Sequence, residues 1–319
     1  MSTAVVDHSP AAVADGRRQV LLGIAAMMLA VAVFAVMEAA VKWLSDGYPT
    51  LQIVFFRSAF ALLPLGLLLW WRGELRSGIR TRRLSAHLVR SSIGFGSLVG
   101  FFYAYGQMPL ADVIAIGFAA PIFLTALSVW LLAEKVGLHR WSAVVMGLGG
   151  VLIMVRPDGG VFAPAASVAL AATVLYALAM IQVRRMAVTE TASATVFYFS
   201  LLSVVLSGLT LPWNWVTPGP FDAALLVLIG LLGGVGQIAL THAYRLAPVS
   251  AVAPFDYVSL LWGVLFGWLL WGDLPAWATL AGAIIVAASG LYILHREARR
   301  PVPRAMPPAG DGSSALGPL

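Results

Sequence analysis

Glu38 and Arg57 are side chains of opposite charge inside long apolar stretches of the sequence. A charge at such a position is costly in a lipid environment and usually has a pairing, gating or binding role. At about 1.5 Å per helical residue, each lies roughly 10 Å inside its stretch. We therefore predict a Glu38–Arg57 pair in the outer half of the protein. Such a pair either binds a solute or only holds two helices together.

Asp256, His242 and Arg245 form a second group around a short turn at 247–250. Their spacing predicts that they meet near the cytoplasmic face, in the opposite leaflet from Glu38 and Arg57. This group is an inner gate or a proton-handling site, because imidazole titrates near neutral pH. The alternative for His242 and Arg245 is a pair of interfacial side chains.

Aromatic and amide side chains add candidates for contact with a solute. Aromatic faces bind flat or cationic organic molecules well, although most aromatics in membrane proteins pack in the core or at the lipid interface. Phe34 precedes Glu38 by one helical turn, on the same face. The remaining candidates are Tyr103, Tyr176, Trp262 and Gln237.

Several classes of chemistry have no support in the sequence. There is no cysteine, and the five histidines are scattered. Hydrolase, metalloprotease and nucleotide-binding motifs are missing. We therefore predict no catalytic residues, no metal site and no cofactor.

The composition defines the kind of protein that must position these residues. Of the 319 residues, 60% are hydrophobic and only 11% are charged, against about 25% charged in average soluble domains. This excludes a soluble globule and a disordered chain, and it predicts an all-α polytopic membrane protein. The ten stretches predicted to span the membrane are 20–44, 50–71, 87–107, 112–133, 140–155, 165–183, 194–212, 222–246, 250–271 and 275–295.

The basic residues predict the orientation. With ten spans and a cytoplasmic N-terminus, all but three of the 20 Lys and Arg residues fall in cytoplasmic segments, and Arg90 is among the cytoplasmic ones. The exceptions are Lys42 and Arg156 outside and Arg57 within a span. This follows the positive-inside rule and predicts a bacterial-type inner-membrane protein with both termini in the cytoplasm.

The chain also repeats itself weakly. Leu29–Trp43 aligns with Ala171–Arg185, which pairs Phe34 with Tyr176. Farther along, Glu134 aligns with Asp273 at an offset of 139 residues. Because each half has five spans, the second half must be inverted, as in many secondary transporters. The predicted organisation is a cytoplasmic tail at 1–19, a first five-helix repeat at 20–156, a second at 157–296 and a disordered cytoplasmic tail at 297–319.

Three segments resemble the EamA family of the drug/metabolite transporter superfamily: GQMPLA from Gly106, LAPVSAV around Pro248, and LLAEKVGLHRW around Glu134. The stretches Leu51–Phe60 and His87–Gln107 are similar to the branch with S-adenosylmethionine and riboflavin transporters. The resemblance implies that spans one, three, four, six, eight and nine line the solute path.

The sequence thus predicts a secondary transporter that moves a small organic metabolite by alternating access. The substrate expected is a riboflavin-like vitamin, S-adenosylmethionine, or an amino acid or amine. The partners are this solute and the lipid bilayer, with a coupling proton and a homodimer left open and nucleic acid excluded. A membrane-embedded enzyme and a channel or scaffold remain as alternatives.

Overall fold

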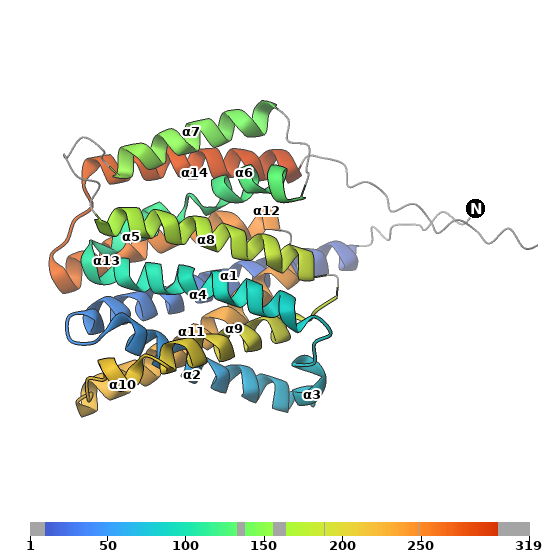
Figure 1. The fold of residues 1–319 in the computed structure, drawn as a ribbon. Helices are drawn as coiled ribbons and strands as arrows, with labels where there is room; N and C mark the ends of the chain where they lie inside the picture. Colours follow the sequence, from blue (N-terminus) through green and yellow to red (C-terminus); the bar gives the residue numbers. More distant parts are fainter. Residues whose placement is uncertain (1–9, 133–137, 156–163, 188, 248, 299–319) are drawn as a thin grey trace, which may run out of the picture.

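The computed structural model describes residues 10–132, 138–155, 164–187, 189–247 and 249–298, and these residues form helices and no strands. The longer helices lie side by side along one common direction (Figure 1). The helices are α1 (Pro10–Ser45), α2 (Thr50–Trp71), α3 (Leu75–Gly78), α4 (Leu84–Gln107), α5 (Leu110–Gly117), α6 (Ala120–Leu132), α7 (Leu138–Val155), α8 (Pro164–Met186), α9 (Ala192–Gly208), α10 (Leu211–Asn214), α11 (Pro220–Leu246), α12 (Val249–Val252), the 3-10 helix η2 (Ala253–Tyr257), α13 (Val258–Trp271) and α14 (Trp277–Ala298).

The prediction of a polytopic helical membrane protein is confirmed. A helix needs about 20 apolar residues to cross a bilayer, where its backbone must satisfy its own hydrogen bonds. Within the described residues, six helical stretches are long and apolar enough to cross a bilayer: Arg18–Ser45, Thr50–Trp71, Leu110–Leu131, Pro164–Met186, Pro220–Leu246 and Pro254–Trp271. Three shorter apolar helices in the same part of the chain cover 141–153, 192–208 and 277–292.

Each helix of the bundle packs against a few distant partners. α1 packs along α11, and α4 packs along α8. α2 packs along α11 and α9, while α7 packs along α14. A Cβ added at Gly230 of α11 would lie 2.4 Å from the Cβ of Phe60, and one added at Gly100 of α4 would lie 2.8 Å from the Cβ of Ala172. Small residues at these crossings therefore let the helix backbones approach closely.

The bundle has two ends, which we name after the short helices that lie there. α3 lies at one end and α10 at the other (Figure 1). The start of α1 is at the α3 end. The second half of the predicted N-terminal tail at 1–19 is helical, because α1 begins at Pro10. Glu134 and most of the predicted tail at 297–319 lie outside the described residues.

Two of the predicted spans are interrupted. The stretch at 112–133 divides between α5 and α6, and the stretch at 250–271 divides between α12, η2 and α13. Pro121 and Pro254 have no backbone N–H, so each removes a hydrogen bond from a continuous helix. The first interruption follows Gly117, and the second contains Asp256. These two residues are 139 positions apart, which is the same offset that relates Glu134 to Asp273. Interrupted helices at corresponding positions of two halves are a feature of transporter binding sites.

Candidate functional site

Glu38 is held by a tyrosine of a neighbouring helix. The hydroxyl of Tyr105, on α4, donates a hydrogen bond to the Glu38 carboxylate on α1. Tyr105 is only 6% exposed. The contact is possible because α1 and α4 pack against each other. A carboxylate in this position has one donor from the protein and further acceptor capacity for a ligand.

Asp256 extends this pair into a larger polar group. Its carboxylate interacts electrostatically with Glu38 and with the hydroxyls of Tyr176, Tyr244 and Tyr257. The side chains of Tyr176 and Tyr244 are 44% and 41% exposed. We call these six residues the acidic cluster: Glu38, Tyr105, Tyr176, Tyr244, Asp256 and Tyr257. It joins α1, α4, α8, α11 and η2.

Arg57 and Arg90 form a second group beside the first. Their guanidinium carbons lie 5.8 Å and 4.5 Å from the ring centre of Phe199 on α9. Gly94 makes room for that ring, because a Cβ there would lie 3.1 Å from its Cε2 atom. Arg90 also interacts electrostatically with Tyr176 of the acidic cluster. We call Arg57 and Arg90 the arginine pair.

The predicted Glu38–Arg57 ion pair is wrong, since the two salt bridges found among the described residues are elsewhere. The Arg57 side chain passes across Gly233 of α11, where an added Cβ would lie 3.2 Å from its Nε. It then reaches Phe199, whereas Glu38 faces Tyr105. The order of helices around the bundle decides this, and it cannot be read from depth in the membrane alone.

The predicted placement of Asp256 and Glu38 in opposite leaflets stays a prediction, and it is compatible with contact between the two side chains. Each residue lies about 10 Å from its own face of a hydrocarbon layer of about 30 Å, which leaves roughly 10 Å between them. Side chains that extend toward the middle shorten this further, and the two carboxylates interact. His242 does not join them: its Nε2 lies 3.3 Å from Nη2 of Arg72.

The other predicted residues are more scattered. The Phe34 ring packs on Gly236 of α11, where a Cβ would lie 2.7 Å from it. Trp262 stacks on Phe266 with ring centres 5.6 Å apart. Tyr103 is 38% exposed. Within the described part of the chain, neither Tyr103, Gln237 nor Trp262 has a side-chain hydrogen bond to the acidic cluster.

Sequence reasoning missed Tyr105, Tyr244 and Arg90 as site residues. Arg90 was assigned to a cytoplasmic segment, but α4 begins at Leu84 and carries it inward to Phe199. Its position inside the predicted span at 87–107 was a signal that could have identified it. Tyr105 and Tyr244 are paired by the repeat at the offset of 139 residues, which was a weaker signal.

Polar contacts join distant segments at the α10 end of the bundle. Lys42 Nζ donates a 2.9 Å hydrogen bond to the carbonyl of Met108 and lies 3.4 Å from Oδ2 of Asp273. The Tyr48 hydroxyl donates to Oδ2 of Asp222 at 2.7 Å, and this bond raises the pKa of Tyr48. These contacts tie α1 and the segments next to it to the second half of the chain.

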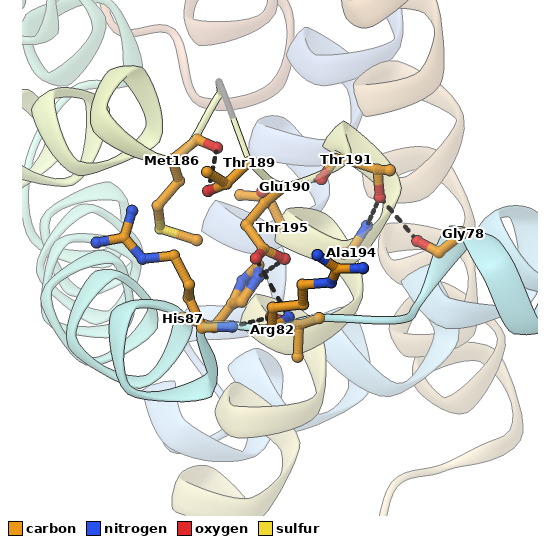
Figure 2. A network of polar contacts seen from close by, with 11 residues as sticks. Gly78, Arg82, His87, Met186, Thr189, Glu190, Thr191, Ala194 and Thr195 are labelled. Atoms are coloured by element: carbon orange, nitrogen blue, oxygen red, sulfur yellow. Dashed lines mark hydrogen bonds and ion pairs between the residues drawn. The ribbon is translucent and has the colours of Figure 1, made fainter.

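A denser network lies at the α3 end, where the segment between α8 and α9 meets the start of α4 (Figure 2). His87 and Glu190 are buried side chains whose Nε2 and Oε2 atoms are 3.0 Å apart. The backbone N–H of Arg82 donates to Oε1 of Glu190 at 3.3 Å. Thr191 accepts from the N–H of Ala194, which caps α9, and donates to the carbonyl of Gly78. The hydrogen bond from His87 lowers the pKa of Glu190.

The lowered pKa of Glu190 predicts a pH dependence of stability. A carboxyl with a depressed folded-state pKa contributes stability above its unfolded pKa of about 4.3 and loses it as pH falls through the folded value. We expect Glu190→Gln to reduce the melting temperature at neutral pH and to flatten its decline below about pH 4.5. Thermal unfolding of the purified protein in detergent across this range measures both. Parallel pH curves for the two proteins would contradict the assignment.

The fold and these two groups of residues define a class of protein. A helical membrane bundle with interrupted helices and with charged side chains inside its apolar stretches is typical of solute carriers. Among the described residues, no group of three or more His, Cys, Asp or Glu side chains could hold a metal ion.

The comparisons with known proteins identify the family. Residues 21–156 match the EamA-like transporter family. The pseudopaline exporter of Pseudomonas aeruginosa is 32% identical over 270 residues, which cover 84% of this chain and 94% of the exporter. The chain therefore belongs to the EamA-like transporter family, and it is a transporter of small metabolites.

Two further relatives and one solved structure agree. The riboflavin transporter of Rhizobium johnstonii is 30% identical over 86% of this chain and 91% of its own length. The S-adenosylmethionine uptake transporter of Rickettsia prowazekii is 24% identical over 89% of this chain and 96% of its own. One crystal structure, 17% identical, superposes with a TM-score of 0.60 over 89% of this chain and 99% of the other. It supports the fold alone.

Proposed function

We propose that this chain is a secondary carrier of the inner membrane that moves a small cationic or zwitterionic metabolite by alternating access. The observation that carries the proposal is the acidic cluster, in which the carboxylates of Glu38 and Asp256 interact with each other and with tyrosines of neighbouring helices, through one hydrogen bond and through electrostatics. A cationic nitrogen or sulfonium group gains from both carboxylates and from the aromatic faces. Charges buried in a membrane protein are expensive and mark solute or ion pathways.

The proposed architecture is ten spans in two inverted five-helix repeats, 20–156 and 157–296. Helix packing supports it. If the two halves are exchanged, the α1–α11 contact takes the place of the α8–α4 contact, and the α2–α9 and α7–α14 contacts each map onto themselves. The family match over 21–156 supports the first boundary. The distribution of basic residues supports a cytoplasmic location for the α3 end and for both termini. Inverted halves can close alternately toward either side of the membrane.

The relatives narrow the substrate. Their names specify S-adenosylmethionine, pseudopaline and riboflavin. The acidic cluster favours S-adenosylmethionine or an amino acid or amine over a neutral ring such as that of riboflavin, because the carboxylates of Glu38 and Asp256 gain most from a positive charge. A proton is the proposed coupling ion, since the same carboxylates can bind one. We propose no catalytic role for any residue.

Uptake into cells tests the substrate class. Cells that lack their own uptake systems and express the chain receive labelled S-adenosylmethionine, histidine, tryptophan or riboflavin. We expect movement of at least one of the three cationic or zwitterionic compounds at a rate that saturates. Movement of riboflavin alone would contradict the cationic or zwitterionic class.

The contacts at the two ends are the proposed gates. Lys42 joins α1 to Asp273, and His87 of α4 joins Glu190, so each contact links the first half of the chain to the second. Alternating access requires contacts of this kind to open in turn while the other end stays closed. Lys42 is further held over the Trp271 ring, 5.2 Å from its centre.

Removing the Lys42 charge tests the gate at the α10 end. We expect Lys42→Met to raise the population open at this end about fivefold, since a partly exposed ion pair contributes up to about 1 kcal/mol. The chain has no cysteine, so a single Met108→Cys reports opening through its rate of labelling by an impermeant maleimide. A Gly47→Cys reporter in the nearby exposed loop serves as the control. Equal labelling of Met108→Cys with and without the Lys42 change would contradict the gate.

A further inference from the structure

The arginine pair is a concentration of positive charge within the bundle. Arg57 is the eighth residue of α2 and is 8% exposed, while Arg90 is the seventh residue of α4. Both guanidinium groups lie within 6 Å of one aromatic ring, Phe199, and they interact electrostatically with each other. α9, which carries Phe199, packs against both α2 and α4. Three helices therefore build the surroundings of this pair.

No carboxylate neutralises these charges within the described residues, where neither arginine forms an ion pair. The Nε of Arg57 and the Nε and Nη1 of Arg90 are buried without a hydrogen-bond partner. Three serines of the same helices, Ser58, Ser91 and Ser203, also have buried hydroxyls without a partner. Buried polar groups are normally paired, and two like charges without a counter-ion are especially costly. Donors in excess on this scale fit an anionic ligand.

We propose that the arginine pair binds the carboxylate of a zwitterionic solute whose cationic group lies at the acidic cluster. The inference rests on the proposed function and specifies the substrate class of the same site. Guanidinium groups present a planar fork of donors that matches a carboxylate. Tyr176 connects the two groups, because its hydroxyl interacts electrostatically with both Asp256 and Arg90. One molecule with an amino and a carboxylate group can therefore contact both.

A lipid headgroup does not fit this position. Both arginines lie about two helical turns from the ends of their helices, or roughly 10 Å at about 1.5 Å per residue. Arg57 is nearly covered, and the arginines face the ring of Phe199 between helices. The carboxylate therefore belongs to a solute that enters the bundle.

Matched pairs of compounds test this inference by binding. Wild-type protein in lipid nanodiscs is titrated with S-adenosylmethionine, histidine and tryptophan and with the decarboxylated counterpart of each, and the rise in melting temperature gives each affinity. We expect the carboxylate-bearing member of at least one pair to bind about tenfold more tightly, as one charge-assisted interaction allows. Arg57→Gln and Arg90→Gln should each reduce this preference to less than about threefold and leave the affinity for the decarboxylated member unchanged.

Three controls keep the result interpretable. Arg80→Gln changes an exposed arginine outside the bundle and should keep the full preference. Arg57→Lys and Arg90→Lys retain the charge, should fold if the glutamine variants do not, and should keep part of the preference. An equal loss of affinity for both members of a pair would indicate a structural role and overturn the inference. Equal wild-type affinities, or no binding of any compound, would also overturn it.

Binding in nanodiscs and transport in vesicles together separate a failure of this inference from a failure of the proposed function. A carboxylate preference in nanodiscs without saturable transport in vesicles would overturn the carrier and support the anion site. Saturable transport of an amine without any preference for its carboxylate-bearing counterpart would support the carrier and overturn the anion site.

Discussion

Glu38→Gln is expected to weaken the binding of a cationic solute at least tenfold and up to about 100-fold, because a hydrogen bond to a charged group is worth roughly 1.5–3 kcal/mol. Glutamine keeps the size of the side chain and can still accept from Tyr105, but it removes the negative charge. The loss should therefore appear as weaker binding and slower transport at limiting solute concentration, with little change in melting temperature. Competition binding in nanodiscs and initial rates in vesicles measure the two effects.

Two controls make the Glu38 result specific. Glu74→Gln removes a carboxylate from an exposed position before α3 and should leave binding unchanged. Glu38→Asp keeps the charge on a shorter side chain and should retain part of the affinity. A Glu38→Gln protein that binds and transports as the wild type does would remove this carboxylate from the site.

Gly230→Leu is expected to destabilise the bundle by about 3 kcal/mol or more, at the upper end of overpacking effects. A Cβ at this position would lie 2.4 Å from the Cβ of Phe60 and 2.8 Å from the carbonyl oxygen of Phe56. These atoms belong to the α2 backbone and its first side-chain carbon, so α2 and α11 must separate. Because Arg57 is on the contacting part of α2, the change should also reduce binding.

Gly66→Leu is the matched control for this effect. Gly66 lies on α2 as well, but nothing lies within 4 Å of an added Cβ. We expect its melting temperature in detergent to stay near that of the wild type. If both variants melted at the same temperature, the close crossing of α2 and α11 would not be a main source of stability.

Much of the fold could be predicted because it follows from local composition. Stretches of apolar residues long enough to cross a bilayer are visible one at a time, and helices occupy them. The interruptions after Gly117 and around Asp256 were not predicted. They depend on how Pro121 and Pro254 affect the backbone, and a proline in a membrane helix can bend it or break it.

The site was predictable only in part, because it depends on which helices are neighbours. Glu38 and Asp256 were recognised as charges inside predicted spans and Tyr176 through the repeat that pairs it with Phe34, and Asp256 interacts with both of the others. Their partners Tyr105 and Arg90 come from α4, whose position beside α1 and α8 is not encoded in any short segment. Arg57 was recognised as buried but was paired with the wrong neighbour for the same reason.

Counterflow in proteoliposomes tests the carrier most directly. Vesicles containing the purified protein are loaded with an excess of unlabelled S-adenosylmethionine, histidine or tryptophan and then diluted into a trace of the same labelled compound. We predict that at least one label accumulates transiently inside, only in preloaded vesicles, and that Glu38→Gln abolishes the accumulation. A flux that rises in proportion to concentration and ignores the preload, or no flux of any of the three compounds, would contradict alternating access at the acidic cluster.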